Sequence, residues 1–178
     1  MVLMVRGANG SGKSTFLRLI AGLLAPTEGY ITLCYQGHPV PDRHRWLGWC
    51  ATDGALYREL TAYEHLHWWA TVRGLQWEPA ARADILMTHL ARFELADRAH
   101  ERVRAYSTGM RQRLRLALAT LGAPPLLLLD EPDAGLDAAG LRLIEQVIDE
   151  QRARGITLFA TNRQDAECWG DLCLAMGA

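Results

Sequence analysis

Eight consecutive residues near the start of the chain have the types and the spacing that bind a phosphate group. In order they are Gly7, Ala8, Asn9, Gly10, Ser11, Gly12, Lys13 and Ser14, which fit the pattern G-x-x-x-x-G-K-[ST]. Glycines let consecutive backbone N–H groups converge on one phosphate, and a helix that begins there adds free donors and a positive dipole end. We therefore predict a nucleotide site in which Lys13 reaches the β and γ phosphates and Ser14 ligates Mg²⁺. A glycine-rich turn with a surface lysine is the alternative interpretation.

A second group of candidate residues ends an apolar run farther along the chain. Leu126–Leu129 is continuously apolar, as in a strand buried on both faces, and Asp130 and Glu131 follow it directly. Asp130 at the strand end can hold Mg²⁺ directly or through water, and Glu131 can polarise an attacking water as a general base. A strand followed by a charged turn would explain the same residues, so this assignment depends on the phosphate loop upstream.

A third candidate lies at the start of a predicted helix, in the run Tyr106–Met110. Ser107 and Gly109 offer a hydroxyl and free backbone N–H groups, and the dipole of the helix favours an anion there. These features suit a phosphate. An ordinary helix N-cap has the same residue types, so the segment by itself leaves both interpretations open.

These residues need a scaffold of alternating strands and helices, which the apolar periodicity predicts. Strands are expected at residues 2–5, 30–35, 46–50, 126–129, 156–160 and 172–176. Helices are expected at residues 15–24, 61–73, 79–93, 109–121 and 138–154. Thr61 and Glu64 form a capping-box pattern at the start of the second helix. The fold class is therefore α/β in one domain, residues 1–178. Its core is expected at about 1–60 and 122–178, and a helical subdomain at about 61–121.

Composition and charge exclude several classes of function. A net charge of −1 over 178 residues gives no broad attraction to nucleic acid or to lipid, and we predict no nucleic-acid partner. No apolar run in the sequence is long enough to cross a bilayer, so any membrane association would go through a partner. The cysteines form no C-x-x-C pair and are expected to be reduced, buried thiols: Cys34, Cys50, Cys168 and Cys173.

Taken in order, the three groups resemble motifs of the ATP-binding subunit of an ABC transporter. Residues 7–15, which add Thr15 to the loop, resemble the Walker A motif, and residues 126–131 resemble Walker B with its catalytic glutamate. Residues 107–110 stand where the family has its signature. Residues 134–137 resemble the D-loop, and residues 47–64 the segment around the Q-loop. The resemblance implies a P-loop NTPase fold of ABC type, with a mainly parallel sheet flanked by helices.

The same resemblance implies cofactors and partners. ATP and Mg²⁺ are the cofactors. Two subunits of the family close head to tail around two ATP molecules, so Ser107 and Gly109 would face the phosphate loop of a second copy or of a related subunit. Closure drives a transmembrane permease subunit. That partner would hold this chain at the cytoplasmic face of the inner membrane.

Several positions depart from the family pattern. Alignment through Gly48 and Leu60 puts Thr52 at the Q-loop glutamine, where its shorter hydroxyl would reach Mg²⁺ through a water. Asn162 stands at the switch histidine, and it can donate a hydrogen bond to the γ-phosphate but carries no proton or charge. The chain also begins later than family members do. We therefore expect the N-terminal strands of the usual domain, and the aromatic residue that stacks on adenine, to be missing.

Two functions follow from this pattern. The first is an ATP hydrolase, slow because of Asn162, that powers transport as part of an exporter. The runs Tyr106–Leu114 and Ala160–Asn162 resemble in particular the haem-exporter subunit of cytochrome c maturation. The second is a degenerate subunit that binds nucleotide, or only its partner, without turnover. Tryptophans cluster at positions 46, 49, 68 and 69, which fits either core packing or an aromatic groove for a partner's coupling helix.

Overall fold

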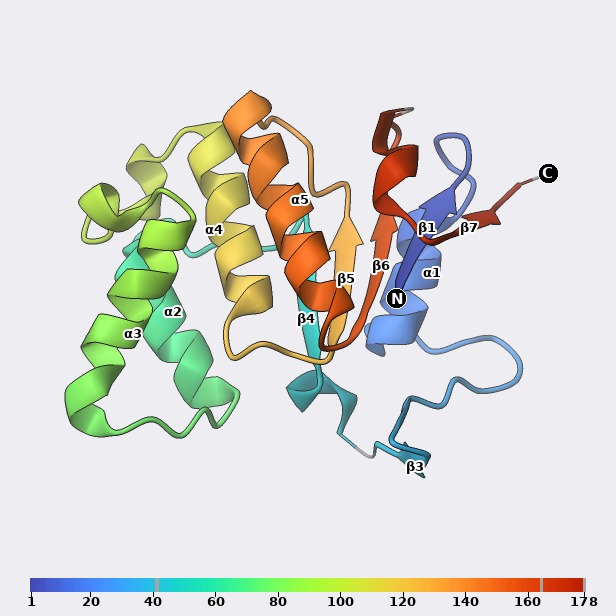
Figure 1. Ribbon diagram of the computed structural model, residues 1–178, viewed down its shortest axis with the longest axis horizontal. Helices are drawn as coiled ribbons and strands as arrows, with labels where there is room; N and C mark the ends of the chain where they lie inside the picture. Colours follow the sequence, from blue (N-terminus) through green and yellow to red (C-terminus); the bar gives the residue numbers. More distant parts are fainter. Residues whose placement is uncertain (41, 164, 178) are drawn as a thin grey trace.

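The computed structural model describes residues 1–40, 42–163 and 165–177 (Figure 1). Within these ranges the core is a five-stranded sheet with the order β4-β5-β6-β1-β7, and each neighbouring pair of strands is parallel. Its strands are β1 (Val2–Arg6), β4 (Leu47–Ala51), β5 (Leu126–Asp130), β6 (Ile156–Ala160) and β7 (Leu172–Ala175). A separate antiparallel hairpin consists of β2 (Cys34–Tyr35) and β3 (His38–Pro39). The predicted parallel α/β class is confirmed.

Helices cover both faces of the sheet, with α4 and α5 on one face and α1 on the other (Figure 1). The α-helices are α1 (Lys13–Ala21), α2 (Ala62–Val72), α3 (Pro79–Arg92), α4 (Thr108–Thr120) and α5 (Ala138–Arg152). The 3₁₀ helices are η1 (Arg43–Arg45), η2 (Ala96–Arg98), η3 (Val103–Ala105) and η4 (Asp165–Trp169). In the part of the chain that the structure describes, no helix has the length and apolarity needed to span a membrane.

Side chains of β5 alternate between two separate hydrophobic clusters. Leu127 and Leu129 belong to the cluster on the side of α4 and α5, whereas Leu126 and Leu128 pack with Leu17 on the side of α1. A parallel strand in the middle of a sheet is covered on both faces, so every position of the strand is apolar. This burial explains the continuous apolar run, and it fixes the strand end from which Asp130 and Glu131 emerge.

The turn from β1 into α1 depends on glycine at defined positions. Gly12 precedes α1 with a φ of 96°, in the left-handed region that residues with a Cβ rarely adopt. Gly7 has no room for a side chain, because a Cβ there would lie 2.4 Å from Ser11 Oγ and 2.6 Å from the Met176 carbonyl oxygen. The glycines of the loop therefore meet backbone requirements, and the loop can wrap tightly at the end of β1.

The helical region packs against the sheet through α4. The predicted capping box of α2 is confirmed: Thr61 Oγ1 accepts from the Glu64 N–H at 3.1 Å, and Glu64 Oε2 accepts from the Thr61 N–H at 2.8 Å. A Cβ on Gly48 in β4 would lie 1.9 Å from the Ala119 carbonyl oxygen, so α4 and β4 make backbone contact. The start of α4 is therefore fixed relative to the strand ends of the sheet.

Some expectations were wrong in detail. Residues 30–35 do not form a full strand. Only Cys34–Tyr35 forms a strand, and Tyr30 is exposed, although Leu33 packs against the hydrophobic cluster on the side of α1. The helix expected to reach Leu24 ends at Ala21, since Gly22 adopts a left-handed C-cap with a φ of 76°. Of the thiols expected to be buried, only Cys50 is; three are exposed: Cys34, Cys168 and Cys173.

Candidate nucleotide-binding site

Lys13 lies buried inside the loop that the sequence predicts to bind phosphate. The residue is only 6% exposed. Its Nζ donates to the carbonyl oxygens of Gly7 at 2.8 Å and Ala8 at 3.1 Å. Lys13 is also the only lysine in the sequence. Two of the three ammonium donors are thus used by the loop itself, which leaves one for a phosphate oxygen.

The two predicted Mg²⁺ ligands with the strongest sequence signal are in direct contact. Ser14 Oγ donates to Asp130 Oδ1 at 3.0 Å, across the gap between α1 and the end of β5. Burial raises the pKa of Asp130, and the hydrogen bond from Ser14 opposes that shift. One hydroxyl and one carboxylate suit Mg²⁺, which takes few protein ligands and completes its shell with substrate phosphates and water. Ser11 Oγ is buried in the same loop and has no hydrogen-bond partner among the residues that the structure describes.

Glu131 occupies an unusual backbone position at the end of β5. Its φ is 49°, in the left-handed region, and its N–H donates to the Ala160 carbonyl oxygen at 2.8 Å. Its carboxylate Oε1 accepts from Asn162 Nδ2 at 2.8 Å. The two residues predicted to be catalytic are therefore neighbours, because β5 and β6 are adjacent parallel strands that end at the same edge of the sheet.

A cavity of about 430 Å³ brings most of the predicted residues together. It is lined by Asn9, Gly10, Gly12, Lys13, Ser14, Thr15, Glu131 and Asn162. A second cavity of about 350 Å³ shares Asn9 and Asn162 with the first and is also lined by Gly7, Ala8 and Thr161. Both lie at the carboxyl edge of the parallel sheet, where ligands bind in open α/β folds.

Five predicted site residues lie outside the lining of these cavities: Ser11 and Asp130, described above, and Ser107, Gly109 and Thr52. Ser107 caps α4 by accepting from the Met110 N–H at 3.2 Å, and a Cβ on Gly109 would lie 3.4 Å from the Gly135 carbonyl oxygen. The start of α4 is thus beside the turn after β5. Thr52 is exposed and follows β4, whose Ala51 pairs with Asp130 in the sheet register. It stands at the same sheet edge as Asp130.

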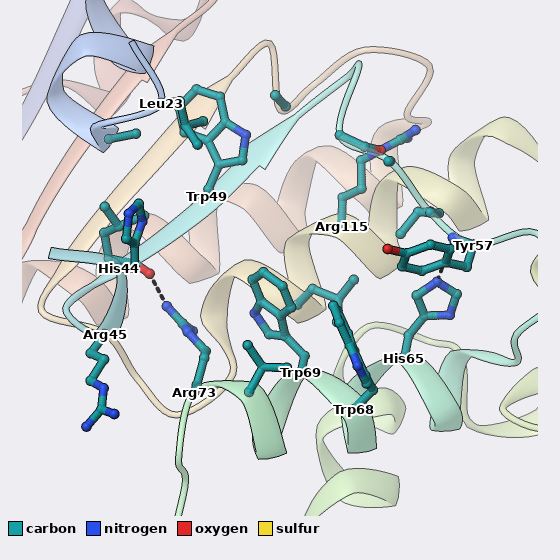
Figure 2. A pocket seen from close by; sticks show the side chains of 18 of the residues that line it. Leu23, His44, Arg45, Trp49, Tyr57, His65, Trp68, Trp69, Arg73 and Arg115 are labelled. Atoms are coloured by element: carbon teal, nitrogen blue, oxygen red, sulfur yellow. Dashed lines mark hydrogen bonds between the residues drawn. The ribbon is translucent and has the colours of Figure 1, made fainter. Parts of the chain in front are cut away.

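An apolar groove of about 600 Å³ opens between β4, α2 and the segment after β4 (Figure 2). Trp49, Trp68 and Trp69 line it, so three of the four clustered tryptophans gather here. Trp46 does not line this groove. Its ring instead lies 4.8 Å from that of Tyr35, measured between centroids.

A buried histidine holds one wall of this groove. His65 Nε2 accepts from the Tyr57 N–H at 2.9 Å (Figure 2). Its Nδ1 donates to the Thr61 carbonyl oxygen at 2.8 Å. Burial lowers the pKa of His65, so the neutral ring that these two bonds require is favoured. The Tyr57 segment is therefore fixed to the first turn of α2.

Sequence reasoning missed the polar residues that support the turn after Glu131. Gln112 is only 2% exposed, and its Nε2 donates to the Pro132 carbonyl oxygen at 3.0 Å. Thr161 Oγ1 donates to Asp133 Oδ1 at 2.9 Å. A signal for Gln112 existed, because it shares a helix face with the buried Leu116 and Ala119 at spacings of four and seven residues. A polar residue on an apolar helix face predicts a buried hydrogen-bond partner.

A parallel sheet, a phosphate loop on a helix start and two carboxylates at the end of β5 define a P-loop nucleotide-binding domain. Its family model is "ABC transporter", which matches residues 1–134, and the chain belongs to that family. Domains of this kind bind ATP, generally with Mg²⁺.

Curated relatives come from bacteria and mammals. The chain is 33% identical over 173 residues to the uncharacterized ABC transporter ATP-binding protein YhaQ of Bacillus subtilis, covering 94% of this chain and 56% of the relative. It is 37% identical over 170 residues to the fluoroquinolones export ATP-binding protein MT2762 of Mycobacterium tuberculosis, covering 94% and 54%. The match to the mouse ABC-type organic anion transporter ABCA8B is 40% over 148 residues, covering 83% and 9%. The chain therefore spans about half the length of these bacterial relatives.

Solved structures agree with the fold. A structure described as the ATP binding subunit of an ABC transporter superposes with a TM-score of 0.84 at 31% identity, covering 98% of this chain and 74% of the other. The dimeric post-hydrolysis state of the ATP-binding cassette MJ0796, bound to ADP and Pi, superposes with a TM-score of 0.82 over 99% of this chain and 80% of the other. At 23% identity the second match supports the fold alone.

Proposed function

We propose that this chain hydrolyses Mg-ATP slowly, with Glu131 as the general base, and that the hydrolysis powers a membrane-embedded partner of an exporter. One observation carries the proposal. Glu131 lines the same cavity as Lys13 and Ser14, and its carboxylate is hydrogen-bonded to Asn162 at 2.8 Å. The phosphate-binding groups and the group that would activate water thus face one volume, which phosphoryl transfer to water requires.

The proposed step follows from the residues around the cavity. Ser14 and Asp130 would hold Mg²⁺, which neutralises charge on the β and γ phosphates when bound. Lys13 binds a phosphate oxygen through its remaining donor, and the loop N–H groups bind the others. Glu131 takes a proton from water as the water oxygen bonds to the γ phosphorus and the bond to the β-phosphate oxygen breaks. ADP and inorganic phosphate are the products.

Asn162 is proposed to orient Glu131 and to be the reason for a slow reaction. Its amide donates one hydrogen bond but cannot become cationic, so charge that develops in the transition state is less well neutralised than by an imidazolium. Thr52 at the end of β4 is proposed to complete the Mg²⁺ shell through a water. The exposed Thr52 and Asn162 are also the observations that favour the alternative, a degenerate subunit that binds nucleotide without turnover.

Two partner surfaces complete the proposal. Ser107 and Gly109 would contact the phosphate loop of a second copy or related subunit, since neither lines the cavity of its own chain. Residues 61–121 would move as a helical subdomain during that closure. The apolar groove with Trp49, Trp68 and Trp69 suits a short helix of a multi-span permease, which would hold the chain at the cytoplasmic face of the membrane. Haem is the proposed cargo, because residues 106–114 and 160–162 resemble the haem-exporter subunit.

The test is initial phosphate release from saturating Mg-ATP by the parent chain, Glu131→Gln and Glu145→Gln. Glu131→Gln keeps an oxygen that can accept from Asn162 and removes the base, so the rate should fall about 10²- to 10⁴-fold. Glu145→Gln is the matched control, because Glu145 accepts from Trp169 Nε1 at 3.1 Å away from the cavity. A parental rate of zero, or an unchanged rate in Glu131→Gln, would replace the hydrolase with the degenerate binding subunit.

A further inference from the structure

The position of Glu131 depends on the turn that its own backbone begins. Residues 131–134 form a turn in which the Ala134 N–H donates to the Glu131 carbonyl oxygen at 3.2 Å. The left-handed φ of 49° at Glu131 is unfavourable for a residue with a side chain, so neighbouring groups must hold it in place. On the β6 side, the Ala160 carbonyl oxygen does so by accepting from the Glu131 N–H.

On the other side, the support comes from the amide of Gln112 on α4. Its Nε2 donates to the Pro132 carbonyl oxygen at 3.0 Å and more weakly to that of Glu131 at 3.4 Å. The third neighbour of Nε2 is Cys50 Sγ at 3.8 Å, and burial raises the pKa of that thiol to about 12. The thiol is therefore neutral, and the turn carbonyls are the closest acceptors of Gln112 Nε2.

The oxygen of the Gln112 amide is hydrogen-bonded on the side of the apolar groove. Gln112 Oε1 accepts from Arg115 Nη1 at 3.3 Å, and Arg115 Nε donates to the Gly54 carbonyl oxygen at 2.9 Å. Arg115 and Gly54 both line the apolar groove, where Figure 2 shows Arg115 beside the segment that follows β4. Hydrogen bonds thus run without a gap from the wall of the groove to the turn that carries Glu131.

We propose that Gln112 is a positioning residue for Glu131, and that Arg115 anchors Gln112 to the groove. The proposal rests on the proposed function of Glu131 as the base. Gln112 does not line either of the two cavities at the phosphate loop, so it acts on Glu131 through the turn of residues 131–134. Loss of its amide would let the Glu131 backbone relax from the left-handed region and move the carboxylate. In the described part of the chain, the side-chain hydrogen bonds of Gln112 go to Cys50, Glu131, Pro132 and Arg115 and not to the phosphate loop, so nucleotide binding should be spared.

Gln112→Met tests this directly, because it keeps the length and volume of the side chain and removes both polar atoms. A displacement of about 1 Å of a reacting group costs about 10²-fold, so kcat should fall about 10- to 100-fold while the Kd for Mg-ATP stays within about twofold. Gln112→Glu retains an acceptor for Arg115 but cannot donate to the turn as a carboxylate. It should lower kcat as Gln112→Met does.

Gln151→Met is the matched control. Gln151 is 4% exposed, and its Nε2 donates to the carbonyl oxygen of another proline, Pro124, at 2.7 Å. That bond lies at the opposite end of β5 from Glu131. If buried glutamines only stabilise the fold, both methionine variants should lower the melting temperature alike and neither should change kcat. A selective loss of kcat in Gln112→Met separates positioning from stability.

Arg115→Met and the double variant, which combines Arg115→Met with Gln112→Met, test whether Arg115 acts through Gln112. If Arg115 acts only through Gln112, Arg115→Met should lower kcat less than Gln112→Met, and the double variant should match Gln112→Met within about twofold. Should Gln112→Met not fold, Gln112→Glu and Arg115→Met carry the same comparison. If the Gln112 and Arg115 variants retain the parental kcat, the positioning role of Gln112 is refuted, and the proposed hydrolase function is not affected. If the parent shows no turnover, or if Glu131→Gln has the parental kcat, both the positioning role and the hydrolase function are refuted.

Discussion

Replacing the only lysine should separate phosphate binding from everything else that the loop does. In Lys13→Met the apolar stem is kept and the charge is lost. The ammonium of Lys13 already donates to the carbonyl oxygens of Gly7 and Ala8, and one donor remains. A phosphate can therefore gain a full charge-assisted hydrogen bond without breaking either contact. Such a bond contributes about 1.5–3 kcal/mol, so the Kd for Mg-ATP should rise about 10- to 150-fold.

Isothermal titration of Mg-ATP into the parent and into Lys13→Met measures this change. Arg154→Met is the matched control. It removes one positive charge from an exposed pair in which Arg154 Nη2 lies 2.9 Å from Glu150 Oε2, far from the loop in sequence. Its Kd should stay within about twofold of the parental value, since exposed ion pairs contribute little. Comparing the two variants therefore removes the effect of net charge.

Chemical labelling gives a second measurement on the unmodified chain. Because Lys13 is the only lysine, an amine-acylating reagent has two targets, Lys13 Nζ and the amino group of Met1. Mg-ATP should protect Lys13 and leave labelling of Met1 unchanged. Equal affinity of Lys13→Met and the parent, or acylation of Lys13 that Mg-ATP does not slow, would refute the phosphate-loop assignment.

Three further outcomes follow from single contacts. Asn162→His should raise kcat, because an imidazolium can neutralise charge that an amide cannot; an unchanged rate of phosphate release would exclude the missing imidazole as the limit. Asp130→Asn should raise the melting temperature at pH 7 while abolishing Mg-dependent hydrolysis. Burial raises the pKa of Asp130, so ionised Asp130 disfavours folding above its unfolded pKa, and the gain should vanish at lower pH, where the carboxyl is protonated in both states. Thr61→Ala removes the acceptor for the Glu64 N–H and should cost about 1 kcal/mol in urea unfolding, with no change in the Kd for Mg-ATP.

Features that depend on neighbouring residues in the sequence could be predicted well. The glycine spacing of residues 7–14 reports a turn whose backbone needs glycine, and the apolar run before Asp130 reports a strand covered on both faces. Thr61 and Glu64 cap a helix whichever elements surround it. In each case the residues that make up the pattern lie within a few positions of one another, so their types and spacing carry the information.

Features that depend on how elements pack could not be predicted in the same way. Residues 30–35 alternate as a strand does, but alternation becomes a strand only where another strand and an apolar layer are available. The contact between Asn162 and Glu131 needs β5 and β6 to be adjacent, which neither segment specifies alone. The partner of Gln112 likewise depends on where α4 crosses the sheet. Its spacing could predict burial, but not the carbonyl of Pro132.

The placement of α4 gives the proposed functions a common mechanical element. Ser107 at its start is proposed to face a second subunit, Gln112 supports the turn of Glu131, and Arg115 reaches the groove. A helix rises 1.5 Å per residue, so about 12 Å of one rigid element separates the first of these side chains from the last. Any shift of the helix would therefore move all three together. Because α4 also makes backbone contact with β4 at Gly48, such a shift would involve the segment that follows β4. Contact at the groove and closure against a second subunit would then act on Glu131 through the same helix.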